Sequence, residues 1–307
     1  MMESFLFIID LLASSLRLAT PLIFCALAGV LSERAGVIDI GLEGKMLFAA
    51  FAAATVGVVT GSWPLAMLAA IAVACALSAL HGFACVTYQG NQVISGLAIN
   101  IIAAGLTVVL GIAWFKQGGQ TPQVPDAVRF KEMFDIPLLG QNAFVYVAIA
   151  LVFVVWWLLF RTRFGLRLRA VGENPAMVDA AGVSVVGTRY LALMGNGALC
   201  GLAGCYLVLA QNASFAPHMT AGRGFMALAA MIFGKWHPIG ALWACLLFGF
   251  LDALAIRLQG TKLPGIGEIP VQFIQALPYL ITVILLAGFI GKAVAPRALG
   301  SPYIKSR

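Results

Sequence analysis

The chain has 307 residues, of which 62% are hydrophobic and 10% are charged, with a net charge of +7. Because a soluble domain carries about a quarter charged residues, this composition excludes a water-soluble monomer, and the 20 Phe and 6 Trp exclude a disordered chain. The positive charge does not indicate nucleic-acid binding, since Lys and Arg stand in the gaps between apolar runs, where they act as topology signals.

The apolar runs predict an all-α integral membrane protein, a polytopic helical bundle of about eight to ten transmembrane segments in a single domain over residues 1–307. A spanning helix needs about 20 mostly apolar residues. The run at 224–234 is shorter, so we expect a half-helix there, or a helix that joins its neighbour through the break at 234–238. In chain order, the predicted spans are 5–31, 45–60, 64–87, 93–115, 142–160, 190–210, 224–234, 238–258 and 272–291.

Basic residues predict the orientation of this bundle. The loop 161–189 and the tail 292–307 together hold nine of the 19 Lys and Arg residues, and the positive-inside rule places both segments in the cytoplasm. If all nine runs cross the membrane, the amino terminus lies outside. The gap 116–141 carries as many acidic as basic residues and is rich in Gln and Pro, so we expect an external loop.

The segment 32–46, with the sequence SERAGVIDIGLEGKM, interrupts an apolar region with five charged residues and three glycines. Irregular backbone at membrane depth is tolerated only where it lines a cavity or is buried in protein. One interpretation places Asp39 and Glu43, four residues apart, on one face of a helix that enters a translocation pathway. The alternative is an interfacial loop with Glu33 and Arg34 at the water boundary.

Polar residues also open the fourth predicted span, where burial in lipid is costly. Such side chains either line a route for a solute or join helices through hydrogen bonds. Small residues at Gly197 and Gly201 predict close helix packing. The residues that we expect along a substrate pathway are Asp39, Glu43, Asn91, Gln92 and Asn100.

The loop 161–189 contains start and stop signals for a short helix. Asn174 is a residue type that caps a helix, and Pro175 suits the first helical turn because its missing N–H costs nothing there. Gly182 favours the end of the helix, since glycine adopts the left-handed conformation that helix ends need. From composition alone, the segment is either a solvated connector or a docking helix for another subunit.

The sequence has no motif for catalysis. It contains no phosphate-binding loop of the form GxxxxGK[ST], no HExxH and no GxSxG, and its three histidines are too scattered to indicate a metal site. The six cysteines fall within apolar runs and form no CxxC, so we expect buried thiols. We therefore expect a transport or scaffold protein that is not an enzyme and binds no cofactor or metal itself.

The chain resembles the permease subunits of bacterial ATP-binding cassette (ABC) importers, in the nucleoside-type branch related to branched-chain amino acid and ribose permeases. The resemblance is carried by ERAGVIDIGLEGKMLFAAFAA, GNQVISGLAINIIAAGLT, RAVGENPAMVDAAGV and GRGFMALAAMIFGKWHPIGALWACLLFGFLDAL. It implies a complex in the bacterial plasma membrane with ATPase subunits that use ATP, a second, non-identical permease and an external substrate-binding lipoprotein. It also implies a coupling helix seated on the ATPase, formed by Gly172, Glu173, Asn174, Pro175, Asp179 and Gly182.

The resemblance implies a pathway for a small polar solute, with nucleosides as the first candidate. Simple sugars and branched-chain amino acids are the alternatives, and an ion-coupled secondary transporter is a further one; membrane lipids surround the chain in each case. The family more often has Asn at the position of Asp39 and an apolar residue at that of Lys45. The added charges either form a compensating pair near the pathway or lie at an interface.

Overall fold

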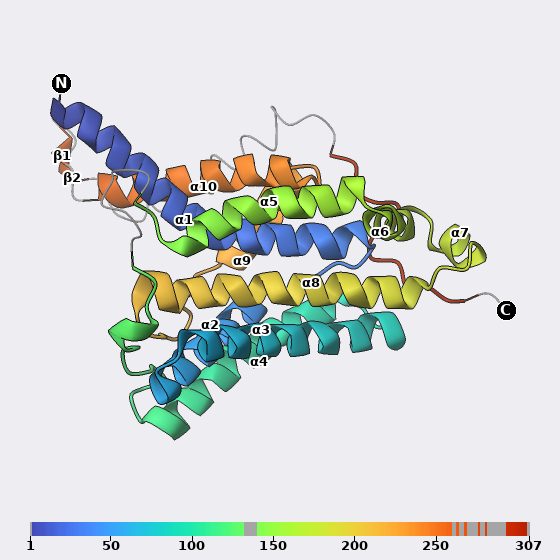
Figure 1. Cartoon of the computed structure of the whole chain (residues 1–307), viewed down its shortest axis with the longest axis horizontal. Helices are drawn as coiled ribbons and strands as arrows, with labels where there is room; N and C mark the ends of the chain where they lie inside the picture. Colours follow the sequence, from blue (N-terminus) through green and yellow to red (C-terminus); the bar gives the residue numbers. More distant parts are fainter. Residues whose placement is uncertain are drawn as a thin grey trace.

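The computed structural model describes residues 2–131, 140–259, 262–263, 267–268, 276, 280 and 293–305. Its long helices run side by side in one elongated bundle (Figure 1). In chain order the elements are α1 (Met2–Arg34), α2 (Leu42–Thr60), α3 (Trp63–Gly82), the π-helical turn η1 (Phe83–Thr87), α4 (Gln92–Phe115), the 3-10 turn η2 (Asp126–Val128), α5 (Ala143–Arg161), α6 (Arg163–Glu173), α7 (Pro175–Ala180), α8 (Val185–Tyr206), the π-helical turn η3 (Leu207–Asn212), α9 (Arg223–Phe233), α10 (Pro238–Leu258) and the antiparallel two-residue strands β1 (Lys262–Leu263) and β2 (Gly267–Glu268).

Seven of the described helices are long and apolar enough to cross a membrane, and α9 is a shorter apolar helix. These eight match the first eight predicted spans, so the prediction of an all-helical, polytopic membrane bundle is confirmed. The ninth predicted span, 272–291, lies outside the described residues except at two positions. The amphipathic helix α6 was not predicted, because its arginines indicated only a cytoplasmic loop.

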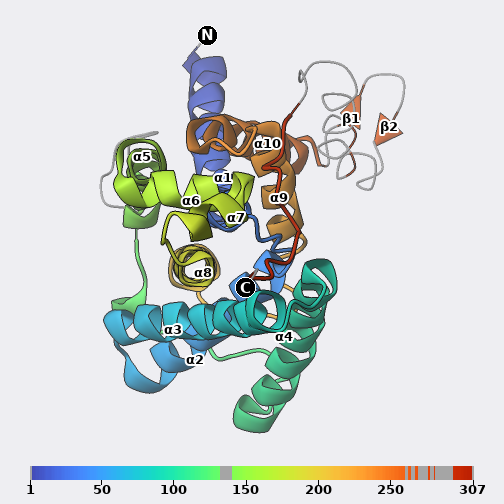
Figure 2. The ribbon, with the colours of Figure 1, turned by 90° about the vertical axis from the view of Figure 1, so that its right-hand side faces the viewer.

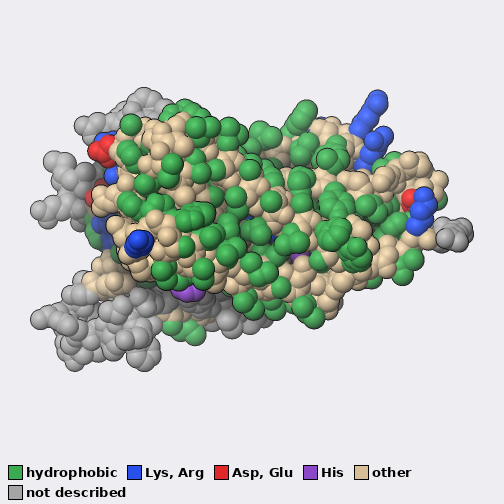
Figure 3. All heavy atoms as spheres, turned by 90° about the horizontal axis from the view of Figure 1, so that it is seen from below, with side chains coloured by type: hydrophobic (Ala, Val, Ile, Leu, Met, Phe, Trp, Pro, Cys, Tyr) green, Lys and Arg blue, Asp and Glu red, His purple; other side chains and the backbone are tan. Residues whose placement is uncertain are grey.

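The two ends of the bundle carry different segments. The amino terminus lies at one end, whereas α6, α7 and the described tail 293–305 lie at the other (Figure 1). On the face shown in Figure 3, hydrophobic side chains spread along the length of the bundle and Lys and Arg gather towards its ends. This distribution is that of a membrane protein, whose apolar flank faces lipid and whose charges face water.

Helix α8 lies near the centre, between α1 on one side and α2 and α3 on the other (Figure 2). Glycines permit its close approach to α3. A Cβ atom on Gly197 would lie 2.7 Å from Cys75 Cα, and one on Gly201 would lie 2.6 Å from Ile71 Cα. The close packing predicted from this pair of glycines is therefore confirmed.

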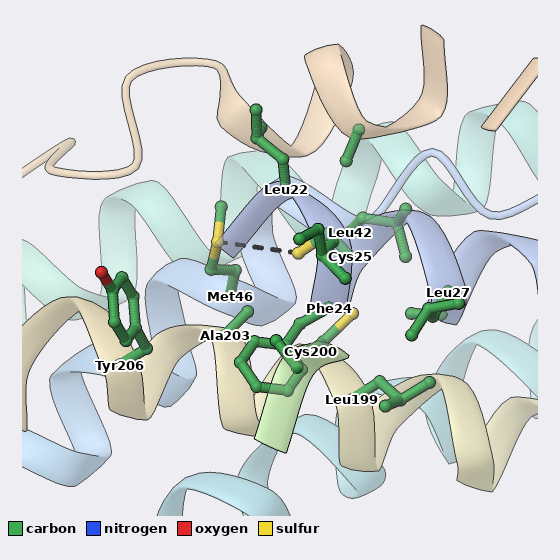
Figure 4. Packing of buried hydrophobic residues seen from close by; sticks show 14 of the residues in the cluster. Leu22, Phe24, Cys25, Leu27, Leu42, Met46, Leu199, Cys200, Ala203 and Tyr206 are labelled. Carbon is green, nitrogen blue, oxygen red and sulfur yellow. Dashed lines mark hydrogen bonds between the residues drawn. The ribbon is translucent and has the colours of Figure 1, made fainter. Parts of the chain in front are cut away.

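The apolar core lies where α1, α2 and α8 meet (Figure 4). There Cys25 Sγ lies 3.7 Å from Met46 Sδ, and Cys200 belongs to the same buried cluster. All six cysteines are unpaired; five are buried and Cys75 is half-buried. The thiols thus act as small apolar side chains, as predicted.

Helix α9 is a half-helix. Its 11 residues extend about 16 Å, roughly half of the 30 Å hydrocarbon core. After α9 the chain turns at 234–237, where the carbonyl of Trp236 accepts a hydrogen bond of 2.9 Å from Arg34 Nε at the end of α1. α10 then begins at Pro238. The start of α9 therefore lies inside the bundle, and the candidate functional site is next to it.

Candidate functional site

The α1–α2 break, residues 35–41, is irregular backbone held by side chains of α3 and α4. The N–H of Ile38 donates to Gln92 Oε1 at 2.7 Å, and its carbonyl lies 2.9 Å from His81 Nε2. Asn100 Nδ2 donates to the carbonyl of Ile40 at 3.0 Å. Because the polar groups of buried backbone need such partners, these side chains fix the break in one conformation.

Asp39 and Lys45 form an ion pair in which both side chains are fully buried. Lys45 Nζ also donates to Asn196 Oδ1 at 3.1 Å, and Asp39 Oδ1 accepts from the N–H of Gly41 at 3.0 Å. Asn196 in turn accepts from the Ser78 hydroxyl at 3.2 Å. The prediction that the two added charges form a compensating pair is confirmed, and the pair joins the break, α2 and α8.

The prediction that Asp39 and Glu43 share one helix face is wrong. Helix α2 begins at Leu42, so Asp39 stands in the break whereas Glu43 stands in the first helical turn. Gly36 and Gly41, which precede α2, disfavour an earlier start of the helix. The two carboxylates consequently face different partners.

Glu43 caps the half-helix α9. Its carboxylate accepts hydrogen bonds from the N–H groups of Gly222 at 2.8 Å and Gly224 at 2.6 Å. A Cβ atom on Gly224 would lie 2.5 Å from the backbone nitrogen of Glu43, so only glycine permits this approach. The negative carboxylate satisfies two of the N–H groups that a helix start leaves free and complements its dipole.

Beside this contact lies a groove of about 390 Å³ between α2, α4 and the segment 218–225. Its polar lining comes from Glu43, Asn100, His218 and Thr220. Asn100 is fixed there because its Oδ1 accepts from the N–H of Gly44 at 2.7 Å. The remaining lining residues are small or apolar: Gly44, Leu47, Leu97, Ile101, Ala104, Ala221, Gly222 and Phe225. The groove thus offers a few placed polar groups on an apolar wall, which is typical of a small-molecule site.

The other predicted pathway residues lie away from the groove lining. Asn91 caps α4, since its Oδ1 accepts from the N–H groups of Val93 at 3.0 Å and Ile94 at 3.1 Å. Gln92 and Asp39 hold the break, as described above. The structure therefore brings Glu43 and Asn100 together, and it places the other three candidates in supporting contacts.

Asn196 was expected either to line a route or to join helices, and it joins them, whereas His218, Thr220 and His81 were not expected at the site. His218 and Thr220 belong to an irregular segment between two apolar runs, and no local pattern marks such residues. The polar residue His81 inside an apolar helix was a usable signal, because buried polar side chains in a membrane have partners.

The predicted coupling segment has the expected local structure. Asn174 Oδ1 accepts from the N–H of Met177 at 3.2 Å, and α7 begins at Pro175. Gly182 has a φ of +79° and follows the end of α7, which confirms the predicted stop. The six residues of α7 project from the end of the bundle (Figure 1).

The remaining coupling residues lie on both sides of α7. Gly172 is buried, and a Cβ atom there would lie 2.2 Å from the carbonyl oxygen of Arg34. Glu173 is exposed. Asp179 Oδ1 lies 3.8 Å from Lys305 Nζ in the tail. Gly172 thus packs against the end of α1 and Asp179 faces the tail, whereas the surface of α7 itself stays open, with Met177 69% exposed.

Comparisons with known proteins now bear on this arrangement. The model of a family described as the branched-chain amino acid transport system, permease component, matches residues 11–289. The chain is 41% identical to a guanosine ABC transporter permease protein of Bacillus subtilis (strain 168) and 38% identical to a nucleoside ABC transporter permease protein of Lactococcus lactis subsp. cremoris (strain MG1363), with 96% and 97% of each chain covered. A second guanosine ABC transporter permease protein of Bacillus subtilis is 26% identical, over 80% of this chain and 73% of that protein.

Proposed function

Because the chain belongs to the family of permease components of the branched-chain amino acid transport system, we propose that it forms one half of the membrane pathway of an importer for nucleosides. It is a transport component rather than an enzyme, and the family implies that a partner ATPase uses the ATP. The observation that carries the nucleoside assignment is similarity over nearly the full length to relatives named for guanosine and nucleoside transport.

The groove beside Glu43 is the proposed solute route on this chain. Glu43, Asn100, His218 and Thr220 offer hydrogen-bonding groups at the level where α9 begins. A nucleoside has the matching chemistry, with hydroxyls and base edges that hydrogen-bond and a flat apolar base that packs on walls such as Leu97 and Phe225. Asp39, Gln92 and Asn91 act as supports of this route.

A second, non-identical permease is the proposed other wall. The groove opens sideways, since Ile101 is 73% and Phe225 44% exposed, and lipid against the Glu43 carboxylate would be costly. Pairing with another permease removes that cost. The two guanosine permease proteins of Bacillus subtilis that resemble this chain support such a pair.

The end that carries α7 and the tail is proposed to face the cytoplasm and the ATPase. It gathers the basic residues of 161–189 and of the described tail 293–305, and the amino terminus lies at the opposite end of the bundle. On this orientation the external loop 116–141 faces a substrate-binding lipoprotein.

Uptake by the reconstituted complex tests the function. We expect vesicles that contain both permeases, the ATPase and the loaded binding protein to accumulate radiolabelled guanosine in preference to glucose or leucine. Asn100→Ala is expected to reduce this uptake while complex assembly persists. Thr107→Ala is the matched control, because Thr107 lies on the same helix and its hydroxyl bonds only within α4. Uptake of glucose or leucine but not guanosine would contradict the proposed substrate.

A further inference from the structure

The described tail bridges two segments that are far apart in the sequence. The N–H of Ala298 donates to the carbonyl of Gly172 at the end of α6, at 2.8 Å, and the N–H of Gly300 donates to the carbonyl of Gly36 in the α1–α2 break, at 3.2 Å. These donors are two residues apart on one short peptide. The tail therefore fixes the distance between α6 and the break through main-chain bonds.

Arg189 of α8 also joins the tail to the α1–α2 break. Its side chain is only 1% exposed, and its guanidinium donates from Nε to the carbonyl of Ala35 at 3.3 Å and from Nη1 to that of Ser301 at 3.2 Å. Among the described residues, both of these acceptors are main-chain carbonyls and no carboxylate forms an ion pair with Arg189. A buried charge is costly, and an apolar side chain would fill the space without that cost. The planar fork of Arg, which contacts two segments at once, accounts for its presence.

The same tail also contacts α7. Lys305 Nζ lies 3.8 Å from Asp179 Oδ1, and Tyr303 packs against the apolar cluster that contains Val178. Desolvation and the nearby Asp179 carboxylate raise the pKa of the Tyr303 phenol. The tail thus touches α7, the end of α6 and the α1–α2 break.

The break leads directly to the groove. A Cβ atom on Gly300 would lie 2.8 Å from Ile38 Cδ1, so tail and break are in contact at a second point. Four residues separate Ile38 from Glu43, and this stretch is held by Gln92 at Ile38 and by Asn100 at Ile40. Because these contacts hold the break in one conformation, we expect it to move as one piece, so that a shift at Gly36 reaches Glu43 and the cap of α9.

We propose that Arg189 and tail residues 298–301 are positioning elements that join the coupling segment to the α1–α2 break, so that a displacement of α7 by the ATPase reaches Glu43. The inference rests on the proposed function, since it assigns α7 the contact with the ATPase. It adds the route by which that contact acts on the groove. Without the bridge, the complex is expected to hydrolyse ATP still, but with less uptake for each ATP hydrolysed.

The experiment measures uptake per ATP hydrolysed in vesicles that contain the full complex. Arg189→Met keeps the buried stem and removes the fork, and Ala298→Pro removes the N–H that bonds to Gly172. We expect both variants to assemble and to hydrolyse ATP at the basal rate, while uptake per ATP falls about tenfold, a common size for coupling between sites. Arg189→Lys keeps the charge without the fork and is expected to behave as Arg189→Met does.

Val294→Pro is the matched control, because it places a proline in the same tail at a side chain that is 78% exposed. This variant is expected to keep full coupling. Normal uptake per ATP in Arg189→Met and Ala298→Pro would overturn the proposal, as would full rescue by Arg189→Lys. Failure of the proposed function is seen separately, because the unmodified complex would then take up no nucleoside.

Discussion

Replacing Lys45 with Met is expected to destabilise the protein strongly. The change leaves the Asp39 carboxylate without its cation at a site where both side chains are fully buried, and removal of one partner from a buried ion pair costs about 3–5 kcal/mol. Met matches the length of the Lys stem, so loss of packing adds little. For a chain of this size the melting temperature should fall by roughly 10 °C.

Removing both charges should recover most of that loss. In Asp39→Asn/Lys45→Met, the new Asn side chain can still accept the 3.0 Å hydrogen bond from the N–H of Gly41. Asn196 loses the Lys45 donor but still accepts from the Ser78 hydroxyl at 3.2 Å. Exchange of a buried ion pair for neutral groups of similar volume is often without cost, so we expect stability within about 1.5 kcal/mol of the unmodified chain.

Thermal unfolding of the purified protein in detergent, for all four chains of this double-mutant cycle, gives the coupling energy directly. Lys131→Met is the matched control, because Lys131 lies 3.6 Å from Asp126 in a pair whose side chains are 67% and 74% exposed. Such surface pairs contribute at most about 1 kcal/mol. The argument from burial is refuted if Lys45→Met has the melting temperature of the unmodified chain, or if the double variant is as unstable as the single variants.

Gly182→Val should cost about 1–2 kcal/mol at its φ of +79° and abolish substrate-stimulated ATP hydrolysis; stimulation at the unmodified level would show that the loop is only a connector. Gly224→Ala should displace α9, because its Cβ would lie 2.5 Å from the Glu43 nitrogen, and uptake of labelled guanosine should fall steeply. Gly222→Ala is the control, because it adds only the strain of a left-handed φ. Ala180→Cys should react with an impermeant maleimide only in inside-out vesicles, and reaction in intact cells would reverse the proposed orientation.

The spans and helix ends were predictable because their signals are local. Apolar runs, the Asn174 cap and the Gly182 stop each act within a few residues, so they needed no knowledge of partners. The same holds for Gly197 and Gly201, whose spacing places both on one face of α8.

The candidate site was only partly predictable, because its contacts join distant parts of the chain. Glu43 was marked by its charge inside an apolar region, yet its partners Gly222 and Gly224 lie 179 and 181 residues away. The pairing of Asp39 with Lys45 was one of two alternatives, because the sequence does not show where either side chain points. Arg189 counted only as a topology signal, since the positive-inside rule assumes that such residues face water.

The six-residue separation of Asp39 and Lys45 has a consequence for biogenesis. Among the seven candidate spans of the described chain, Leu42–Thr60 is the least apolar, and a lone Lys at its start would oppose release from the translocon into lipid. Because the counter-charge is only a few residues away, Lys45 can enter the bilayer already paired with Asp39 before α8 is synthesised. Asn196 then binds a lysine that is already paired, so the order of synthesis matches the order in which the network is completed.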